Sequence, residues 1–575
     1  MIKQLLRSLR EYKKPAILTP IIVGCEVIME CAIPFVVAML VENIENGCGL
    51  TTIAIYGAIL IAMAAVSLTC GAFAGKFCAN ASCGFAKNLR KDMFEKIQTY
   101  SFENIDNFQS SSLVTRLTTD VVNVQHSFMM IIRTAIRSPL MLIFSFTMGF
   151  IMGGKIAWIY LVVMPILFFG LFFIARKAMP LFKKVFKKYD NLNNSIQENI
   201  KGMRVVKSFV REEFEINKFD KAATDVANDF TKAERILAFN SPIMQFCLNV
   251  IMIVILSFGS YVVVSSRGQD VSVSQLSALL TYGFQILMSL MMISMIYVMI
   301  TMSIESAKRI CEVLEAKSNI ENKIDPVMNV KDGSIEFKDV SFKYVNSKMI
   351  LENVNLSIKS GETIGIIGGT GSAKTTLVQL ISRLYDVTSG EVLVGGVNVK
   401  DYDLDVLRNE VSMVLQKNIL FSGTIIDNLK WGNENATLDE MKEVCKLACC
   451  DEFITSFPKG YNTYIEQGGS NVSGGQKQRL CIARALLKRP KIIIFDDSTS
   501  AVDTKTDAII RKGLKEYIPS VTKIIIAQRV ASVEDADRII VMNNGIIDGI
   551  GTHDELLESN EIYKEVYESQ NKIGE

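Results

Sequence analysis

The stretch that decides the fold of the second half of this chain reads Gly368-Gly369-Thr370-Gly371-Ser372-Ala373-Lys374-Thr375-Thr376. It lies between two apolar runs, 364–367 and 377–381, which predict a buried strand and a helix. A glycine-rich loop in this context binds phosphate, because its backbone N–H groups and the helix N-terminus point at the phosphate oxygens. We therefore expect Lys374 to reach the β- and γ-phosphates of ATP, and the Thr375 hydroxyl to bind Mg²⁺.

Strand-like runs alternate with helical patterns from residue 334 to residue 575. These runs cover 334–344, 363–367, 411–415, 491–495, 523–526 and 538–542. Such alternation predicts an α/β P-loop domain with a largely parallel central sheet. The preceding segment 317–333 is polar and contains Pro326, so we interpret it as a linker.

Six apolar stretches, each long enough to cross a bilayer as a helix, occupy the first half of the chain. They lie near 16–41, 53–75, 128–152, 156–175, 243–265 and 275–303. The three short connectors contain only two basic residues, Lys155 and Arg267, whereas the long connectors 76–127 and 176–242 are rich in Lys and Arg. The positive-inside rule places the long connectors, both termini and the α/β domain in the cytosol. The sequence thus predicts an α-helical six-span transmembrane domain over 16–316.

Two further features complete this helical half. Residues 1–15 carry five Lys or Arg residues among Leu, Ile and Tyr, which predicts an amphipathic helix on the membrane surface. Apolar residues recur at helical spacing through 85–105 and 189–219. We expect the membrane helices to continue into the cytosol as two stalk pairs that turn near 104–112 and 203–211.

Ionisable residues inside membrane spans are costly and therefore are candidate functional groups. Glu26 and Glu30 are four residues apart in the first span, so they share a helix face. They line a cavity that attracts a cationic substrate, or they pair with Arg133 or Arg137. Both interpretations stay open on the sequence alone.

The sixth span is rich in methionine, including Met291 and Met295. Flexible, polarizable methionine suits a surface that accepts several ligand shapes. The same spacing is typical of ordinary helix packing. Met291 and Met295 are therefore candidate substrate contacts with a plain structural alternative.

Composition limits the other possible partners. The formal net charge of the 575 residues is +2, which argues against a nucleic-acid partner. The twelve cysteines form no CxxC pair and no His/Cys cluster, so no zinc site is expected.

Several motifs accompany the phosphate-binding loop in a fixed order. They are Gln416 after a strand-like run, Ser473-Gly474-Gly475-Gln476, Asp496-Asp497 at the end of an apolar run, and Ser500-Ala501-Val502-Asp503. This set is similar to the ATP-binding cassette of ABC transporters. With six preceding spans, essentially all of the chain resembles an ABC exporter half-transporter.

The resemblance implies roles for the matching positions. Tyr344 corresponds to the aromatic residue that stacks on adenine, Gln416 to the glutamine that contacts Mg²⁺ and water, and Asp496 to a Mg²⁺ ligand. In this family two cassettes pair head to tail. Each ATP then lies between the phosphate-binding loop of one chain and the Ser-Gly-Gly-Gln motif of the other, here Ser473 to Gln476.

Three positions depart from the family pattern. Ala373 replaces a glycine, Asp497 replaces the catalytic glutamate, and Gln528 replaces the phosphate-sensing histidine. All three belong to the chain's own ATP site, whereas the Ser473–Gln476 motif offered to a partner is intact. The pattern resembles the degenerate-site subunit of heterodimeric bacterial multidrug transporters.

From this resemblance we expect an ATP-driven exporter of hydrophobic or amphipathic compounds that acts with a second, non-identical half-transporter. ATP and Mg²⁺ are the expected cofactors, and the bacterial plasma membrane is the expected location. Two alternatives remain: a regulatory pseudo-ATPase that transports nothing, and an importer with exporter architecture. The direction of transport distinguishes an importer from an exporter, and the absence of transport distinguishes a regulator from both.

Overall fold

The computed structural model describes residues 1–571 apart from 109, 267–268, 270, 346 and 498–501. Arg267 and the Ser500-Ala501 part of the last motif lie outside the described residues. The chain forms two compact units. One contains Met1–Gln98 and Gln109–Ala316, and the other contains Thr99–Phe108 and Lys317–Glu575.

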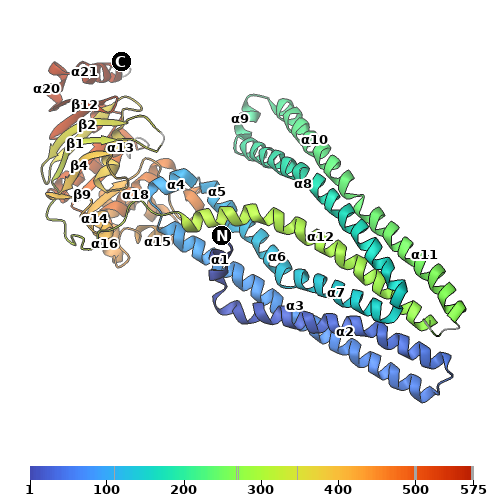
Figure 1. Ribbon diagram of the computed structural model, residues 1–575. Helices are drawn as coiled ribbons and strands as arrows, with labels where there is room; N and C mark the ends of the chain where they lie inside the picture. Colours follow the sequence, from blue (N-terminus) through green and yellow to red (C-terminus); the bar gives the residue numbers. More distant parts are fainter. Residues whose placement is uncertain (109, 267–268, 270, 346, 498–501, 572–575) are drawn as a thin grey trace. The chain divides into compact units, whose positions relative to one another are not determined.

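Long helices build the first unit (Figure 1). They are α2 (Lys13–Glu45), α3 (Leu50–Gln98), α6 (Val121–Ile132), α7 (Thr134–Gly153), α8 (Trp158–Lys201), α10 (Glu212–Leu237), α11 (Asn240–Ser266) and α12 (Val273–Glu315), with the short α5 (Ser110–Thr115), η2 (Arg116–Asp120), η3 (Gly154–Ala157) and α9 (Met203–Ser208). Within the described ranges, five continuous helical stretches are long and apolar enough to cross a membrane. One of them, Ser110–Phe182, turns at Gly154, whose φ is +47°, and so holds the third and fourth expected spans.

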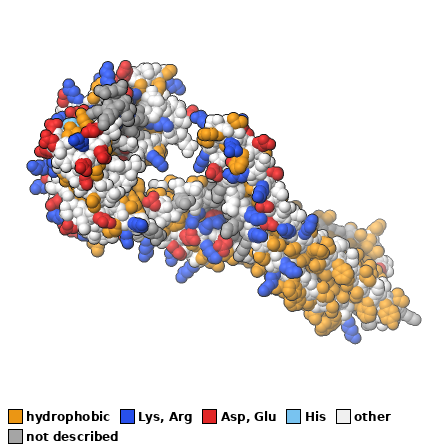
Figure 2. Space-filling model, turned by 90° about the horizontal axis from the view of Figure 1, so that it is seen from above, with side chains coloured by type: hydrophobic (Ala, Val, Ile, Leu, Met, Phe, Trp, Pro, Cys, Tyr) orange, Lys and Arg blue, Asp and Glu red, His pale blue; other side chains and the backbone are white. Residues whose placement is uncertain are grey.

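The membrane helices are much longer than a bilayer is thick. The 49 residues of α3 span about 74 Å at 1.5 Å per residue, against a hydrocarbon core of about 30 Å. The surplus supplies the stalks, and the second stalk pair turns at α9. Figure 2 shows hydrophobic side chains gathered on one end of the helical unit. Large apolar residues of α3, such as Ile61 and Leu68, are exposed. Exposed apolar surface of this extent suits a lipid environment.

The N-terminal segment differs from the expected single helix over 1–15. It consists of α1 (Ile2–Leu5) and a 3₁₀ segment η1 (Leu6–Tyr12) that is broken at Arg10, whose φ is +36°. Arg10 pairs with Asp92 of α3, and Ser8 donates a hydrogen bond to the same carboxylate at 2.6 Å. Tertiary contacts with α3 therefore override the helical pattern of this segment.

The second unit is an α/β domain with two main sheets. The antiparallel sheet has the order β2-β1-β4-β5, from β1 (Ile335–Phe342), β2 (Leu351–Ile358), β4 (Ser389–Val394) and β5 (Val397–Asn398). The larger sheet has the order β12-β11-β3-β10-β9-β6, from β3 (Thr363–Gly368), β6 (Val411–Val414), β9 (Ile492–Asp496), β10 (Thr522–Ile526), β11 (Arg538–Asn543) and β12 (Ile546–Gly551). All its pairings except β11 with β12 are parallel, which confirms the predicted fold class.

Helices cover both faces of the larger sheet, so its strands are apolar on both sides. Ile493 and Ile525 belong to one buried cluster, whereas Ile494 and Ile524 belong to the other. The helices of this unit are α4 (Phe102–Phe108), α13 (Lys374–Ile381), α14 (Leu404–Glu410), α15 (Ile425–Leu429), α16 (Leu438–Leu447), α17 (Asp451–Ser456), α18 (Gly474–Leu487), α19 (Thr504–Tyr517), α20 (His553–Ser559) and α21 (Glu561–Asn571). The carboxyl ends of β3, β9 and β10 meet at one sheet edge, and this edge carries the candidate site.

Candidate functional site

The phosphate-binding loop connects β3 to α13 as the sequence predicts. The Lys374 Nζ atom donates hydrogen bonds to the Gly368 and Gly369 carbonyls, both at 2.8 Å, and to Ser372 Oγ at 3.2 Å. Gly368 is required for packing, because a Cβ there would lie 2.2 Å from the Met542 carbonyl oxygen of β11. Burial lowers the pKa of Lys374, while Asp497 and Asp496 act in the opposite direction. The ammonium group is thus placed inside the loop, close to two carboxylates.

Ala373 replaces a glycine of the family pattern, and its backbone has a conformation that favours glycine. It is the N-cap of α13 and adopts a left-handed conformation with φ +72° and ψ +19°. This conformation suits glycine, whereas an L-residue with a Cβ pays about 1–2 kcal/mol for it. The cost of the alanine therefore arises in the backbone of the loop.

Thr375 and Asp496 come together at the end of β9. Thr375 Oγ1 donates a 2.8 Å hydrogen bond to Asp496 Oδ1, and Asp496 is only 2% exposed. Burial raises the pKa of Asp496, an effect opposed by the Thr375 hydrogen bond and by Lys374. A hydroxyl and a carboxylate beside a phosphate-binding loop form the oxygen ligand set that Mg²⁺ prefers. These residues fit the ion that the sequence implies.

The three residues of the expected hydrolytic centre also meet. Asp497 Oδ2 accepts hydrogen bonds from Gln528 Nε2 at 2.8 Å and from Gln416 Nε2 at 3.2 Å. The arrangement arises because β9 and β10 are parallel neighbours, with Ile526 paired to Asp496. Asp497 follows with a left-handed φ of +48°. One short carboxylate is therefore held between two neutral amides.

Tyr344 lies in an aromatic cluster beside the loop. Its hydroxyl is 3.0 Å from Thr376 Oγ1, and its ring packs edge-on against Phe342 and Tyr385, with centroid separations of 4.9 and 5.2 Å. Burial is the main cause that raises the pKa of Tyr344. One edge of the ring is thereby fixed by the protein, as an adenine platform requires.

Sequence reasoning missed one connection at this cluster. Tyr385 Oη donates a 2.6 Å hydrogen bond to Asp106 Oδ2 of α4, and Phe102 of α4 contacts the Tyr385 ring. Residues 99–108, which include part of the first stalk tip expected near 104–112, thus pack within the ATP-binding unit. The two residues are 279 positions apart, and no pattern in the sequence links them.

The Ser473–Gln476 motif begins α18 on the surface of the unit. Ser473 Oγ accepts a hydrogen bond from the Gln476 backbone N–H at 3.3 Å, and Gln476 Oε1 accepts one from the Ser473 N–H at 2.9 Å. This reciprocal capping fixes the helix start and leaves Ser473 and Gly474 exposed. Among the described residues, no hydrogen bond joins the motif to the chain's own phosphate-binding loop.

In the helical unit, Glu26 and Glu30 bind the same guanidinium group. Arg137 Nη1 donates to Glu26 Oε1 at 2.6 Å, and Arg137 Nη2 donates to both Glu30 oxygens at 2.7 and 2.8 Å. Of the two arginines that the sequence offered, Arg137 is the partner of both carboxylates. Glu26 is 5% exposed, and its Oε2 atom is buried with no hydrogen-bond partner in the part of the chain that the structure describes.

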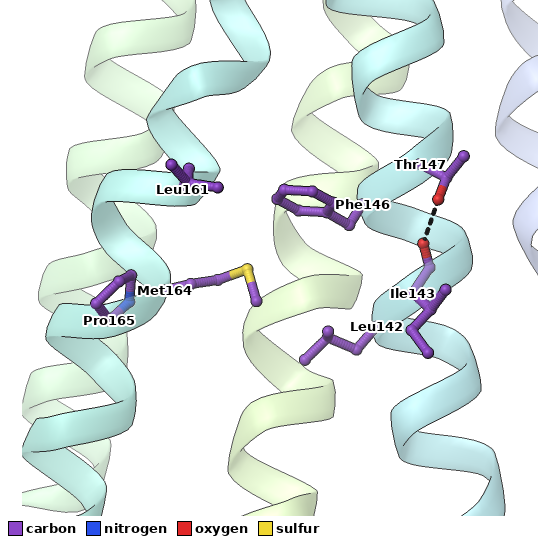
Figure 3. A pocket seen from close by; sticks show the side chains of 7 residues that line it. All are labelled: Leu142, Ile143, Phe146, Thr147, Leu161, Met164 and Pro165. Carbon is purple, nitrogen blue, oxygen red and sulfur yellow. Dashed lines mark hydrogen bonds between the residues drawn. The ribbon is translucent and has the colours of Figure 1, made fainter.

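The other two candidate substrate contacts are Met291 and Met295. Met291 is half-buried and Met295 is 55% exposed on α12. A separate apolar cavity of about 340 Å³ lies between α7 and α8 (Figure 3). Its lining residues are Leu142, Ile143, Phe146, Thr147, Leu161, Met164 and Pro165. The Thr147 hydroxyl donates to the Ile143 carbonyl at 2.8 Å, and none of the four expected substrate residues belongs to this lining.

Comparisons with known proteins cover the whole chain. Residues 17–301 match the family described as ABC transporter transmembrane region, and residues 351–500 match the family described as ABC transporter. The chain is 36% identical to the uncharacterized ABC transporter ATP-binding protein YfiB of Bacillus subtilis, over 99% of this chain and 98% of that protein. It is 33% identical to Rv1273c of Mycobacterium tuberculosis, described in the same terms, over 99% and 98%.

A solved structure shares the fold. The structure of a bacterial Atm1-family ABC exporter with ATP bound superposes with a TM-score of 0.84, at 22% identity, and the match covers 98% of each chain. At this identity the likeness concerns the architecture: a helical membrane region followed by an α/β cassette.

Proposed function

Because this chain belongs to the ABC transporter family and joins one membrane region to one ATPase cassette, we propose that it is one subunit of a heterodimeric exporter. Its own ATP site binds nucleotide and hydrolyses it slowly. Its Ser473–Gln476 motif completes the competent site of a second, non-identical half-transporter. The arrangement of Asp497 between two neutral amides carries this proposal.

Hydrolysis needs a carboxylate that orients and polarises the attacking water. Asp497 is one methylene shorter than glutamate, and a displacement of about 1 Å costs about 100-fold in rate. The Gln528 amide donates to Asp497, whereas a histidine at this position contacts the γ-phosphate in the family. An amide also carries no charge in the physiological range. Both changes weaken the same step.

The other groups at this site support nucleotide binding. Lys374 and the loop N–H groups bind the phosphates, and Tyr344 stacks on adenine. Thr375, Asp496 and Gln416 hold Mg²⁺, which neutralises phosphate charge when bound. The site therefore retains ATP while its hydrolytic centre is degraded.

The intact signature motif favours an unequal pair over two copies of this chain. In a homodimer both ATP sites would contain Asp497, Gln528 and Ala373. In a heterodimer the exposed Ser473 and its capped helix complete a site whose phosphate-binding loop, glutamate and histidine come from the partner. ATP held at the slow site keeps the cassettes together while the competent site cycles, and cassette closure is transmitted through the stalks.

The membrane region carries the substrate specificity. Glu26 and Glu30 carry two negative charges against the single positive charge of Arg137, and this excess negative charge favours hydrophobic or amphipathic compounds with a cationic group. Met291 and Met295 provide adaptable apolar contacts. The cassette faces the cytosol of a bacterial cell, and substrate leaves across the plasma membrane.

ATPase assays of the reconstituted chain, alone and with a half-transporter that keeps Asp-Glu and histidine, test the proposal. We expect slow turnover alone and at least tenfold faster turnover in the pair. Brisk hydrolysis by the chain alone would contradict it. ATP-dependent uptake into inverted vesicles distinguishes the exporter from a regulatory pseudo-ATPase, which moves nothing, and from an importer, which moves substrate the other way.

A further inference from the structure

The loop that follows β10 carries Gln528 and is held at its backbone by the C-terminal helix α21. Gln570 Nε2 donates a 2.8 Å hydrogen bond to the Gln528 carbonyl oxygen. Gln570 Oε1 accepts a 2.9 Å hydrogen bond from the Val530 N–H. One side-chain amide therefore bridges the two backbone groups on either side of Arg529.

This bridge acts on a residue of the hydrolytic centre. Beyond the bridged carbonyl, the Gln528 side chain donates to Asp497 Oδ2 at 2.8 Å. On the other side, the Ala527 N–H donates to the Ile366 carbonyl of β3 at 3.2 Å. The backbone around Gln528 is thus fixed by the sheet before it and by Gln570 after it.

The helix that carries Gln570 is itself firmly placed. Tyr563 of α21 is fully buried, and its hydroxyl lies 2.7 Å from His553 Nδ1 of α20. The Asn560 side-chain oxygen accepts a hydrogen bond from the Tyr563 N–H at 2.9 Å. Val566 and Tyr567 pack against the buried cluster on this face of the sheet. Gln570 therefore projects from an anchored element, and its amide can hold the loop without a large entropy cost.

We propose that Gln570 is a positioning residue that fixes the 527–530 loop, so that the C-terminal helix sets the direction in which residue 528 points into the ATP site. Both contacts are to the backbone, so the bridge works with glutamine or with histidine at position 528. The effect on hydrolysis rests on the proposed function of the site, whereas the effect on the loop does not.

Hydrogen exchange of the full-length reconstituted chain tests the effect on the loop. In Gln570→Ala, the Val530 amide loses its acceptor, and we expect its exchange to accelerate at least tenfold while the β-strands keep their protection. Gln570→Glu retains the acceptor for Val530 and loses the donor to the Gln528 carbonyl, so protection of Val530 persists in part. Ser569→Ala is the matched control, because among the described residues the Ser569 hydroxyl bonds only to the Val566 carbonyl of its own helix.

ATP hydrolysis tests the consequence for chemistry. We measure it in an Asp497→Glu/Gln528→His background, with Gln570→Ala added. The expected result is a three- to tenfold lower kcat with a KM for ATP within twofold, whereas a merely structural role lowers kcat, ATP affinity and Tm together.

Unchanged exchange at Val530 in Gln570→Ala overturns the proposal. So does a joint loss of kcat, affinity and Tm. A restored background that fails to hydrolyse ATP faster contradicts the proposed function instead, and the exchange result still decides the role of Gln570.

Discussion

Ala373 shows how a single methyl group can strain the backbone of a binding loop. Its left-handed backbone is the conformation that the phosphate-binding loop requires, and glycine adopts it without strain. We predict that Ala373→Gly stabilises the cassette by about 1 kcal/mol, which raises Tm by about 2–4 °C for a domain of this size. Thermal unfolding measured with and without ATP checks this.

The control for Ala373→Gly is an alanine-to-glycine substitution that is expected to change Tm in the opposite direction. Ala485 lies within α18, where glycine costs about 1 kcal/mol because a helix interior restrains a flexible residue. Ala485→Gly is therefore expected to lower Tm. If both variants shift Tm downward, the backbone explanation for Ala373 is wrong.

Asp497 and Gln528 form one unit, because their side chains are directly bonded. Asp497→Glu alone is expected to raise the ATPase rate of the chain only a few-fold, since residue 528 still offers a neutral amide. Asp497→Glu combined with Gln528→His is expected to raise the ATPase rate at least tenfold. Steady-state ATPase assays of the single and double variants measure this, and full recovery by Asp497→Glu alone would remove Gln528 from the account.

Among the elements, α2 and α7 are joined through Arg137. Arg137→Met leaves two carboxylates in the membrane region without their partner, and breaking a buried pair costs about 3–5 kcal/mol. Arg137→Met combined with Glu26→Gln and Glu30→Gln removes the stranded charges, so we predict that it recovers most of the stability. Thermal unfolding in lipid nanodiscs compares the two variants.

Arg10 provides the control for Arg137, since it pairs with Asp92 while 47% of its side chain is exposed. Exposed pairs contribute about 0–1 kcal/mol, so Arg10→Met is expected to change Tm little. If the triple variant is no more stable than Arg137→Met, the ion cluster is not the source of the effect.

The helix α4 is connected to the ATP site through Tyr385. Tyr385→Phe removes the hydrogen bond to Asp106 and keeps the ring in place, so we predict lower ATP-driven transport with unchanged ATP binding. Asp106→Ala has the same effect, and the double variant loses no more than either single one. Transport assays in vesicles, paired with nucleotide-binding measurements, test this cycle.

Tyr402→Phe serves as the control, because the Tyr402 hydroxyl bonds the Val394 carbonyl within the same buried cluster. It is expected to lower stability and leave transport per bound ATP unchanged. Additive losses in the Tyr385 and Asp106 variants would show that their hydrogen bond carries no coupling.

The elements that sequence could predict are those with a local signal. The strand–loop–helix around Lys374 follows from short-range chemistry, and the spans follow from length and hydropathy. Two features depend on tertiary contacts and could not be predicted from the sequence. They are the pairing of Glu26 and Glu30 with Arg137 instead of Arg133, and the break in the N-terminal helical segment at Arg10.

The same reason explains what was missed at the site. Asp106 and Gln570 lie far from the ATP-site motifs in the sequence but belong to the same unit, and neither is part of a motif. The left-handed conformation of Ala373 is likewise invisible in a residue type that normally favours helices.

At the scale of the whole molecule, the residues that depart from the family pattern belong to the chain's own ATP site, and the motif that keeps the pattern is the one offered to a partner. In the proposed heterodimer, Ala373, Asp497 and Gln528 weaken the chain's own site, whereas Ser473 to Gln476 remain available to a partner. A transporter built this way divides two tasks between its sites: one holds ATP and one hydrolyses it. Substitutions in the chain's own site and in the motif should therefore have unequal effects.

The most direct test compares Asp497→Asn and Ser473→Ala in this chain, each assembled with a half-transporter that keeps Asp-Glu and histidine. Thr437→Ala, which removes the equivalent cap of α16, controls for lost helix capping. We predict that the ATPase rate of the pair falls at least tenfold with Ser473→Ala and stays within twofold with Asp497→Asn and with Thr437→Ala. Loss of most activity with Asp497→Asn, or its retention with Ser473→Ala, would contradict the account.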